Sequence, residues 1–203
     1  MKATLGGRTV GLAEELASYE PYNEQEARDC ALIVRYLREA EADPQMAERL
    51  WGRGDPAHMT ASAWVVSPDR SKVLMAYHNI YQSWSWLGGH ADGQRDLRAV
   101  ALREVCEESG LASARLADPG ILSVEVLCVD GHEKRGAYVS SHLHLNVTFL
   151  VEADPGEVPR VKPDENSRIG WMTPGEALAA STEPWFVERI YRKLVAKSSQ
   201  ISS

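Results

Sequence analysis

The segment WLGGHADGQRDLRAVALREVCEESGL, residues 86–111, constrains the fold more than any other part of the sequence. A glycine-rich approach leads into a stretch whose hydrophobic residues recur at helical spacing. At about 100° per residue, Glu104, Glu107 and Glu108 share an arc of roughly 100° on one helix face. Like charges at this spacing destabilise a helix unless something compensates them. The segment therefore predicts either a solvated acidic face, with Arg103 paired to Glu107, or a site for a cation.

Strand and helix patterns surround this segment. Alternating or β-branched hydrophobic runs predict strands at 61–67, 72–78, 121–129, 142–153 and 168–172. Amphipathic spacing, capping residues and first-turn prolines predict helices at 23–43, 96–109, 173–180 and 184–197. Strands and helices mixed in this order predict an α/β or α+β layered fold.

The chain is expected to comprise three parts, which are a helical extension over 1–55, a main domain over 56–198 and a polar tail over 199–203. The single hydrophobic stripe of the helix at 23–43 needs a partner. The extension could cover a substrate cleft, lengthen the core or form a homodimer contact.

Composition excludes several classes of function. The 203 residues carry a formal net charge of −7, which argues against nucleic acid as a partner. No hydrophobic run is long enough to span a membrane and no secretory signal is present, so a soluble cytoplasmic protein is expected. The three cysteines show no C-x-x-C spacing, which predicts buried core residues rather than disulfides or structural zinc.

The glycines before the helix change how its acids are interpreted. Gly88 and Gly89 allow the backbone to approach a ligand closely. Carboxylates and a backbone carbonyl are the hard oxygen ligands that Mg²⁺ or Mn²⁺ prefers. Because such a cation also binds phosphate oxygens, the expected partner is a small-molecule phosphate anhydride.

The same segment resembles the Nudix box, whose pattern is G-x5-E-x7-R-E-U-x-E-E-x-G-U with U an aliphatic residue. With Gly89 as the first glycine, the matching positions are Arg103, Glu104, Val105, Glu107, Glu108, Gly110 and Leu111. Arg95 departs from the pattern, because it stands where the first glutamate belongs. The resemblance extends over about residues 59–178.

This resemblance implies an α/β/α sandwich with a mixed central sheet. It also implies a Mg²⁺- or Mn²⁺-dependent hydrolase that cleaves a diphosphate linkage by attack of water on phosphorus. The substrate would be a nucleoside diphosphate derivative or a nucleoside triphosphate.

Residue roles carry over by position. Glu104, Glu108 and a main-chain carbonyl at Gly88 or Gly89 would hold the metal, and Glu107 would complete its shell or act on water. Arg103 would be a further catalytic residue, and the general base would be Glu107 or Glu165.

Five residues are candidates for substrate contact: Trp86, His90, Arg95, His142 and His144. Four of them have a competing interpretation. His142 and His144 emerge on one face of a strand and could instead pack in the core or form a zinc pair, which lacks a convincing third ligand. Trp86 could fill the core, and Arg95 could be solvated.

Two other functions compete with the hydrolase. A non-catalytic nucleotide sensor on the same fold would explain Arg95, although it has no need for three intact glutamates. An isomerase resembling isopentenyl diphosphate isomerase would need an active-site cysteine. Cys106 lies about 160° from Glu108 around the helix and is predicted to face inward, which disfavours that reaction.

Overall fold

The structure is a computed structural model that describes residues 4–5, 8–9, 11–54, 56–134 and 136–201. The chain forms two compact units. Unit 1 contains Met1–Ala61, His90–Leu97 and Ser123–Val147, and unit 2 contains Ser62–Gly89, Arg98–Leu122 and Thr148–Ser203. The chain passes from one unit to the other inside strands β3 (Ala57–Val66) and β11 (His142–Glu152).

The N-terminal part of unit 1 is mainly helical, as the sequence predicts. Helices α1 (Leu12–Ala17), α2 (Glu24–Ala42) and α3 (Pro44–Trp51) follow two short paired strands, β1 (Thr4–Leu5) and β2 (Arg8–Thr9), which were not predicted. Asn23 caps α2, because its side chain accepts a hydrogen bond from the Glu26 amide at 2.9 Å. The predicted stripe of α2 is buried along Cys30, Ile33, Val34 and Leu37.

A buried carboxylate attaches α2 to strand β8 (Ser123–Val129) within unit 1. Glu26 accepts hydrogen bonds from the Val124 amide at 3.0 Å and from the Ser123 hydroxyl at 2.9 Å. It also accepts from the Tyr19 hydroxyl and the Tyr22 amide. Of the three roles considered for the extension, these contacts support lengthening the core.

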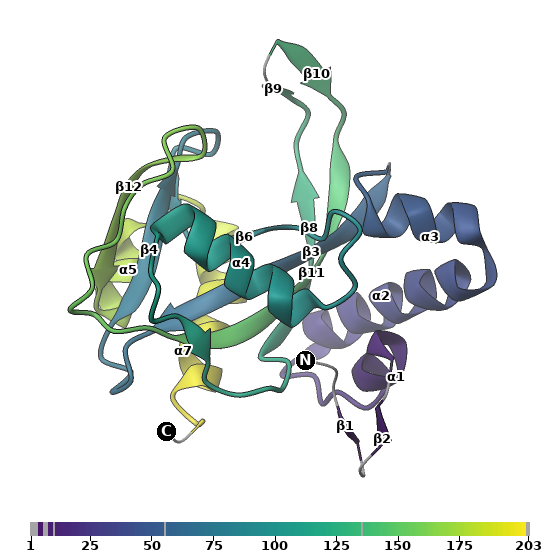
Figure 1. The fold of residues 1–203 in the computed structure, drawn as a ribbon, viewed down its shortest axis with the longest axis horizontal. Helices are drawn as coiled ribbons and strands as arrows, with labels where there is room; N and C mark the ends of the chain where they lie inside the picture. Colours follow the sequence, from purple (N-terminus) through teal and green to yellow (C-terminus); the bar gives the residue numbers. More distant parts are fainter. Residues whose placement is uncertain (1–3, 6–7, 10, 55, 135, 202–203) are drawn as a thin grey trace. The chain divides into compact units, whose positions relative to one another are not determined.

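The rest of unit 1 is a β-structure. Strand β8 pairs with β11, and the segment between them forms a hairpin of β9 (His132–Lys134) and β10 (Ala137–Val139) that projects away from the helices of the unit (Figure 1). The sequence indicated only a connection here, since strands of three residues are too short for a period to be recognised.

Unit 2 contains the strands that flank the acidic helix. Strand β4 (Val73–His78) pairs antiparallel with β12 (Asn166–Met172), with β5 (Ser83–Ser85) and, at Val66–Val73, with β3. Strand β6 (Leu87–His90) pairs with β3, and β7 (Arg115–Leu116) pairs with the end of β11. Helix α4 (Leu97–Ser109) is the helix predicted at 96–109, and it ends at Gly110, whose φ of +68° suits a helix stop.

The C-terminal helices of unit 2 close its core. Helix α5 (Pro174–Ala180) lies beside β4 and β12 (Figure 1). The predicted helix at 184–197 is present as α6 (Pro184–Phe186), a π-helical turn η1 (Val187–Tyr191) and α7 (Arg192–Ser198). Tyr191 in the π-helical turn is fully buried and stacks on Trp64.

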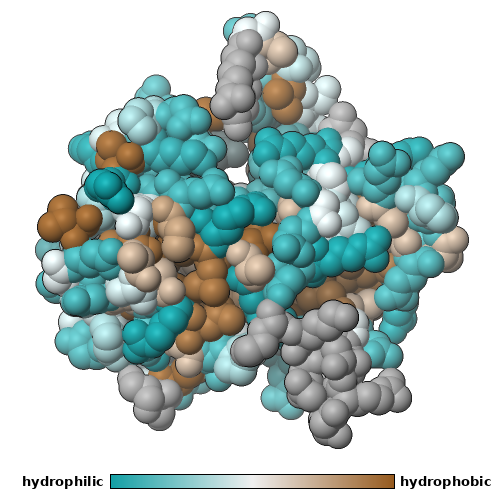
Figure 2. Space-filling model, viewed as in Figure 1, coloured by the Kyte–Doolittle hydropathy of each residue, from teal (hydrophilic) through white to brown (hydrophobic). Residues whose placement is uncertain are grey.

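The mixed α/β fold class with its mixed sheet and helices is therefore confirmed, whereas the boundaries proposed at 55/56 and 198/199 stay predictions. Residues 202 and 203 of the predicted polar tail lie outside the described residues. Hydrophilic residues cover most of the face shown in Figure 2. In the part of the chain that the structure describes, no helix is both long and hydrophobic enough to cross a membrane.

The expectation for the cysteines is wrong at two positions. Cys30 is buried, but Cys106 and Cys128 are exposed. Cys106 follows the buried Val105 by about 100° around α4, which is enough to turn it out of the hydrophobic stripe. Cys128 alternates with the buried Leu127 and Val129 along β8 and so faces the other side of the strand.

Candidate active site

The three glutamates of α4 occupy two different environments in unit 2. Glu104 and Glu108 are nearly buried, with exposed fractions of 8% and 5%. Glu107 is exposed on the same helix. A solvated acidic face, the simpler of the two predictions, is therefore wrong for two of the three carboxylates.

Both buried carboxylates meet the glycine backbone of β6. The Gly88 amide donates a hydrogen bond to Glu108 Oε1 at 2.9 Å. A Cβ atom added at Gly89 would lie 2.6 Å from Cδ and Oε2 of Glu104. Because no side chain could occupy that space, glycine at position 89 is what allows backbone and carboxylate to lie so close together.

Burial makes both carboxyl groups hard to ionise. Burial, together with the nearby Glu165 and Glu104, raises the pKa of Glu108 to about 8 against the opposing hydrogen bond from Gly88. Burial also raises the pKa of Glu104, although the Arg103 guanidinium opposes the shift. Two such carboxyl groups side by side can both be ionised only if a positive charge lies close to them.

Two basic residues supply part of that charge. Arg103 donates to Glu104 Oε1 at 2.7 Å and lies 3.7 Å from Glu107. Lys162 lies between two acids, with Nζ 3.3 Å from Glu107 and 3.1 Å from Glu165. Burial lowers the pKa of Lys162, but its pairing with Glu165 and Glu107 outweighs that effect and raises it.

The donor set suits a small hard divalent cation. Glu104 and Glu108 offer carboxylate oxygens, and the glycine backbone that touches both offers carbonyl oxygen, which are the ligand types that Mg²⁺ and Mn²⁺ take. The space at Gly89 that a Cβ would fill lies against the Glu104 carboxylate, so main chain and carboxylate can reach one ion. The residues present therefore fit the metal.

Two of the candidate substrate contacts lie in unlike surroundings. Trp86 is 9% exposed and packs edge-on against Tyr191 at 5.7 Å between ring centroids, which favours its alternative as a core residue. Arg95 is exposed in unit 1, with its guanidinium carbon 5.6 Å from the ring centroid of Trp51. That contact is within the range of a cation–π interaction.

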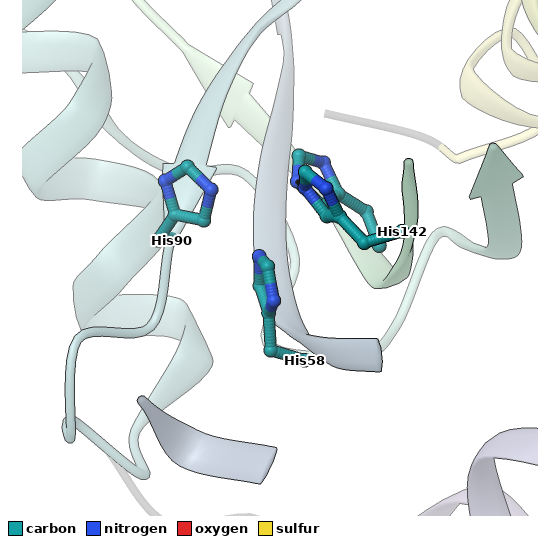
Figure 3. A group of neighbouring side chains, drawn as sticks. His58, His90 and His142 are labelled. Carbon is teal, nitrogen blue, oxygen red and sulfur yellow. Dashed lines mark hydrogen bonds between the residues drawn. The ribbon is translucent and has the colours of Figure 1, made fainter. Parts of the chain in front are cut away.

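The other three candidates lie together in unit 1. His90, His142 and His144 form a cluster with His58, in which each residue offers one ligand atom and all four atoms lie within 4.8 Å of one another. Figure 3 shows the rings of His58, His90 and His142 gathered closely, from β3, the end of β6 and β11. Burial first, and then the neighbouring histidines, lower the pKa of His144 to about 2. His144 is therefore neutral at physiological pH.

Comparison with known proteins places this geometry in a family. The model of the NUDIX domain family matches residues 56–194. The chain belongs to the NUDIX family. It is thus a pyrophosphohydrolase of the Nudix kind, and the match agrees with the box identified from the sequence.

Solved structures share the Nudix fold. A Nudix hydrolase from M. smegmatis, RenU, has a TM-score of 0.54 at 15% identity, with 75% of this chain and 90% of that chain covered. The E. coli dihydroneopterin triphosphate pyrophosphohydrolase has a TM-score of 0.50 at 16% identity, with 68% and 94% covered. At these identities the likeness shows the fold alone. No curated protein matches the chain.

Two residues of this Nudix protein escaped the sequence interpretation. Lys162 sits in a polar loop, and nothing in its spacing connects it to Glu107. His58 stands alone at the start of a strand, 84 residues before the nearest of the two β11 histidines. The pairing of β3 with β11 brings His58 to the two histidines of β11, and the pairing of β6 with β3 brings His90. The one signal in the sequence for His58 was that a polar side chain stands in a strand that is otherwise mainly hydrophobic.

Proposed function

We propose that this Nudix enzyme depends on Mg²⁺ or Mn²⁺ and cleaves a diphosphate linkage in a nucleoside diphosphate derivative or a nucleoside triphosphate. The observation that carries the proposal is the contact of Gly88 and Gly89 with the buried carboxylates of Glu108 and Glu104. Burying a carboxylate without enough compensating charge costs free energy of desolvation, and a bound cation offsets this cost.

Three residues would hold the ion: Glu104, Glu108 and, through its carbonyl oxygen, Gly89. Glu107 would complete the shell or act on water. When bound, the cation supplies charge neutralisation for the phosphate oxygens and the leaving group. Arg103 acts as a positioning residue, because its 2.7 Å contact fixes the Glu104 carboxylate.

Proton transfer falls to a carboxylate beside this set. Water forms the new P–O bond, the bridging P–O bond breaks, and the water proton passes to Glu165 or Glu107. Lys162 lies within ion-pair distance of both acids and so positions both carboxylates. Arg95, an exposed cation, is proposed to contact a substrate phosphate.

Turnover of a substrate panel tests the proposal. Phosphate release, coupled to a phosphatase where needed, is measured from nucleotide sugars, ADP-ribose, dinucleotide cofactors, coenzyme A and (d)NTPs, with Mg²⁺ or Mn²⁺. Dihydroneopterin triphosphate joins the panel because of the E. coli structural neighbour. Hydrolysis that disappears with EDTA and in Glu108→Gln supports the proposal and names the substrate.

A negative result has a definite meaning. If no compound of the panel is hydrolysed, but calorimetry detects metal-dependent nucleotide binding, a non-catalytic sensor is favoured instead. Because Cys106 is exposed, the inward orientation no longer argues against the isomerase alternative, and its angle of about 160° from Glu108 around the helix is the argument that stands against it. Cytoplasmic location and a homodimer stay predictions, to be checked by cell fractionation and by light scattering.

A further inference from the structure

We propose that His58, His90, His142 and His144 form a second metal site, in unit 1, for a divalent transition-metal ion of the Zn²⁺ class. This site is independent of the acidic site on α4. It uses different residues, in a different unit, and it offers nitrogen ligands where the acidic site offers oxygen. Both histidines first considered as an incomplete zinc pair thereby gain a third and a fourth ligand.

The spacing of the four rings fits one ion. In a tetrahedral site with Zn–N distances of about 2.0–2.1 Å, ligand nitrogens lie about 3.3 Å apart. Nε2 of His142 and Nε2 of His144 are already 3.1 Å apart. Since all four ligand atoms lie within 4.8 Å of one another, the remaining nitrogens need move by only about an ångström, which side-chain rotation supplies.

Backbone carbonyls orient two of the rings. The carbonyl oxygen of Ser140 lies 2.8 Å from Nδ1 of His142, and that of Gly54 lies 3.2 Å from Nδ1 of His58. A carbonyl can only accept, so each Nδ1 carries a proton, and in the neutral form of each ring Nε2 carries a lone pair. Outer-shell hydrogen bonds of this kind set the tautomer of metal-binding histidines.

This tautomer also identifies what an ion would displace. With the His142 Nε2 lone pair turned towards His144, the 3.1 Å contact requires His144 Nε2 to donate its proton. An ion bound between these nitrogens takes the place of that proton, and His144 then carries its proton on Nδ1.

The ligand chemistry selects the ion. The cluster comprises four imidazoles without a carboxylate, a set that suits Zn²⁺, Co²⁺, Ni²⁺ or Cu²⁺ far better than Mg²⁺. Arg53 contributes nearby positive charge, but its guanidinium is paired with Asp92 through two contacts of 2.7 and 2.8 Å. The pairing offsets the repulsion that a cation would meet.

Such an ion would connect three separate pieces of chain, which are the start of β3, the end of β6 and the start of β11. Four protein ligands complete a tetrahedral shell, which is the arrangement of structural rather than catalytic sites. The expected effect of the metal is therefore a rise in the melting temperature of the protein.

Cobalt binding to the full-length protein tests the site. After metal is stripped with a chelator, Co²⁺ is titrated and visible absorption recorded, because tetrahedral Co²⁺ absorbs much more strongly than octahedral Co²⁺. One equivalent per chain with strong absorption, displaced by Zn²⁺, is expected. His90→Gln and His144→Gln should each weaken binding at least roughly tenfold, by comparison with the loss on changing even an outer-shell partner.

Two matched controls assign the ion to the cluster. His132 is a histidine of unit 1 outside the cluster, so His132→Gln should leave the spectrum unchanged. Glu108→Gln should also leave it unchanged, whereas an ion held at the acidic site would be lost. Failure of the hydrolase proposal would leave this result intact.

Three outcomes would overturn the inference. These are absence of the strong absorption in the wild-type protein, binding that survives in both cluster variants, and loss of binding in Glu108→Gln. Should the cluster variants fail to fold, zinc X-ray absorption of the wild-type protein decides. Four nitrogen neighbours at about 2.0 Å with imidazole scattering support the site. A shell dominated by oxygen refutes it.

Discussion

Replacement of Gly89 by alanine isolates the contact on which the proposed hydrolase rests. The new Cβ would lie 2.6 Å from Cδ and Oε2 of Glu104, whereas non-bonded carbon atoms prefer about 3.5–4.0 Å. The carboxylate must therefore move by about 1 Å. Because the clashing atoms are the end of a flexible side chain, the displacement should have little effect on the free energy of unfolding.

Catalysis should respond far more strongly than stability. A misplacement of about 1 Å in a catalytic arrangement can lower the rate about 100-fold, which corresponds to about 2.7 kcal/mol of transition-state stabilisation. We expect Gly89→Ala to lower kcat/KM by about that factor on the best substrate of the panel. Its melting temperature should stay within a few degrees of the wild-type value.

Gly170→Ala is the matched control. Gly170 lies in β12 of the same unit, and a Cβ there would meet no heavy atom within 4 Å. Kinetics and thermal unfolding of both variants are compared with the wild type. Full activity in Gly89→Ala, or a loss of activity explained by unfolding, would refute the argument that glycine is needed for Glu104 to hold its position.

Three further changes test other contacts. Lys162→Met should lower kcat with little loss of stability, while Lys162→Arg restores part of it, as measured by steady-state kinetics. Glu26→Ala should lower the free energy of unfolding by about 2–4 kcal/mol in urea titration, because it leaves buried donors unsatisfied; an unchanged midpoint would contradict this. Hydrogen bonds from Ser67 and then Ser71 lower the pKa of Asp69 to about 2. The ionised Asp69 therefore stabilises the folded protein at pH values above the unfolded pKa of about 3.9, and this stabilisation is lost as the pH falls towards 2. The difference in melting temperature between wild type and Asp69→Asn should accordingly be present at pH 7 and shrink below pH 4.

Local patterns made much of the fold and the acidic site predictable. The stripe of α2 and the stop of α4 at Gly110 depend on neighbours within a few residues, so periodicity and capping chemistry identify them. The spacing of Glu104 and Glu108 on one helix likewise follows from helix geometry alone.

Features that depend on the pairing of distant strands could not be predicted in this way. His58 joins His142 only because β3 pairs with β11, and Lys162 reaches Glu107 only through a loop conformation. Cys106 shows a further limit, because a boundary residue of a helical stripe can turn either way. Tertiary packing, rather than local sequence, decides such cases.

The way the chain passes between the units inside β3 and β11 has a consequence for how the protein can be divided. Each unit is assembled from three separate stretches of sequence, so no single cut releases either of them as a continuous fragment. Expression of residues 56–198 alone would also strip α2 from β8 and leave the amide of Val124 without the Glu26 carboxylate. The family match begins at residue 56, but a side chain from the helices before it, Glu26, is hydrogen-bonded inside the matched region, so we expect residues 56–198 alone to be less stable than the full chain.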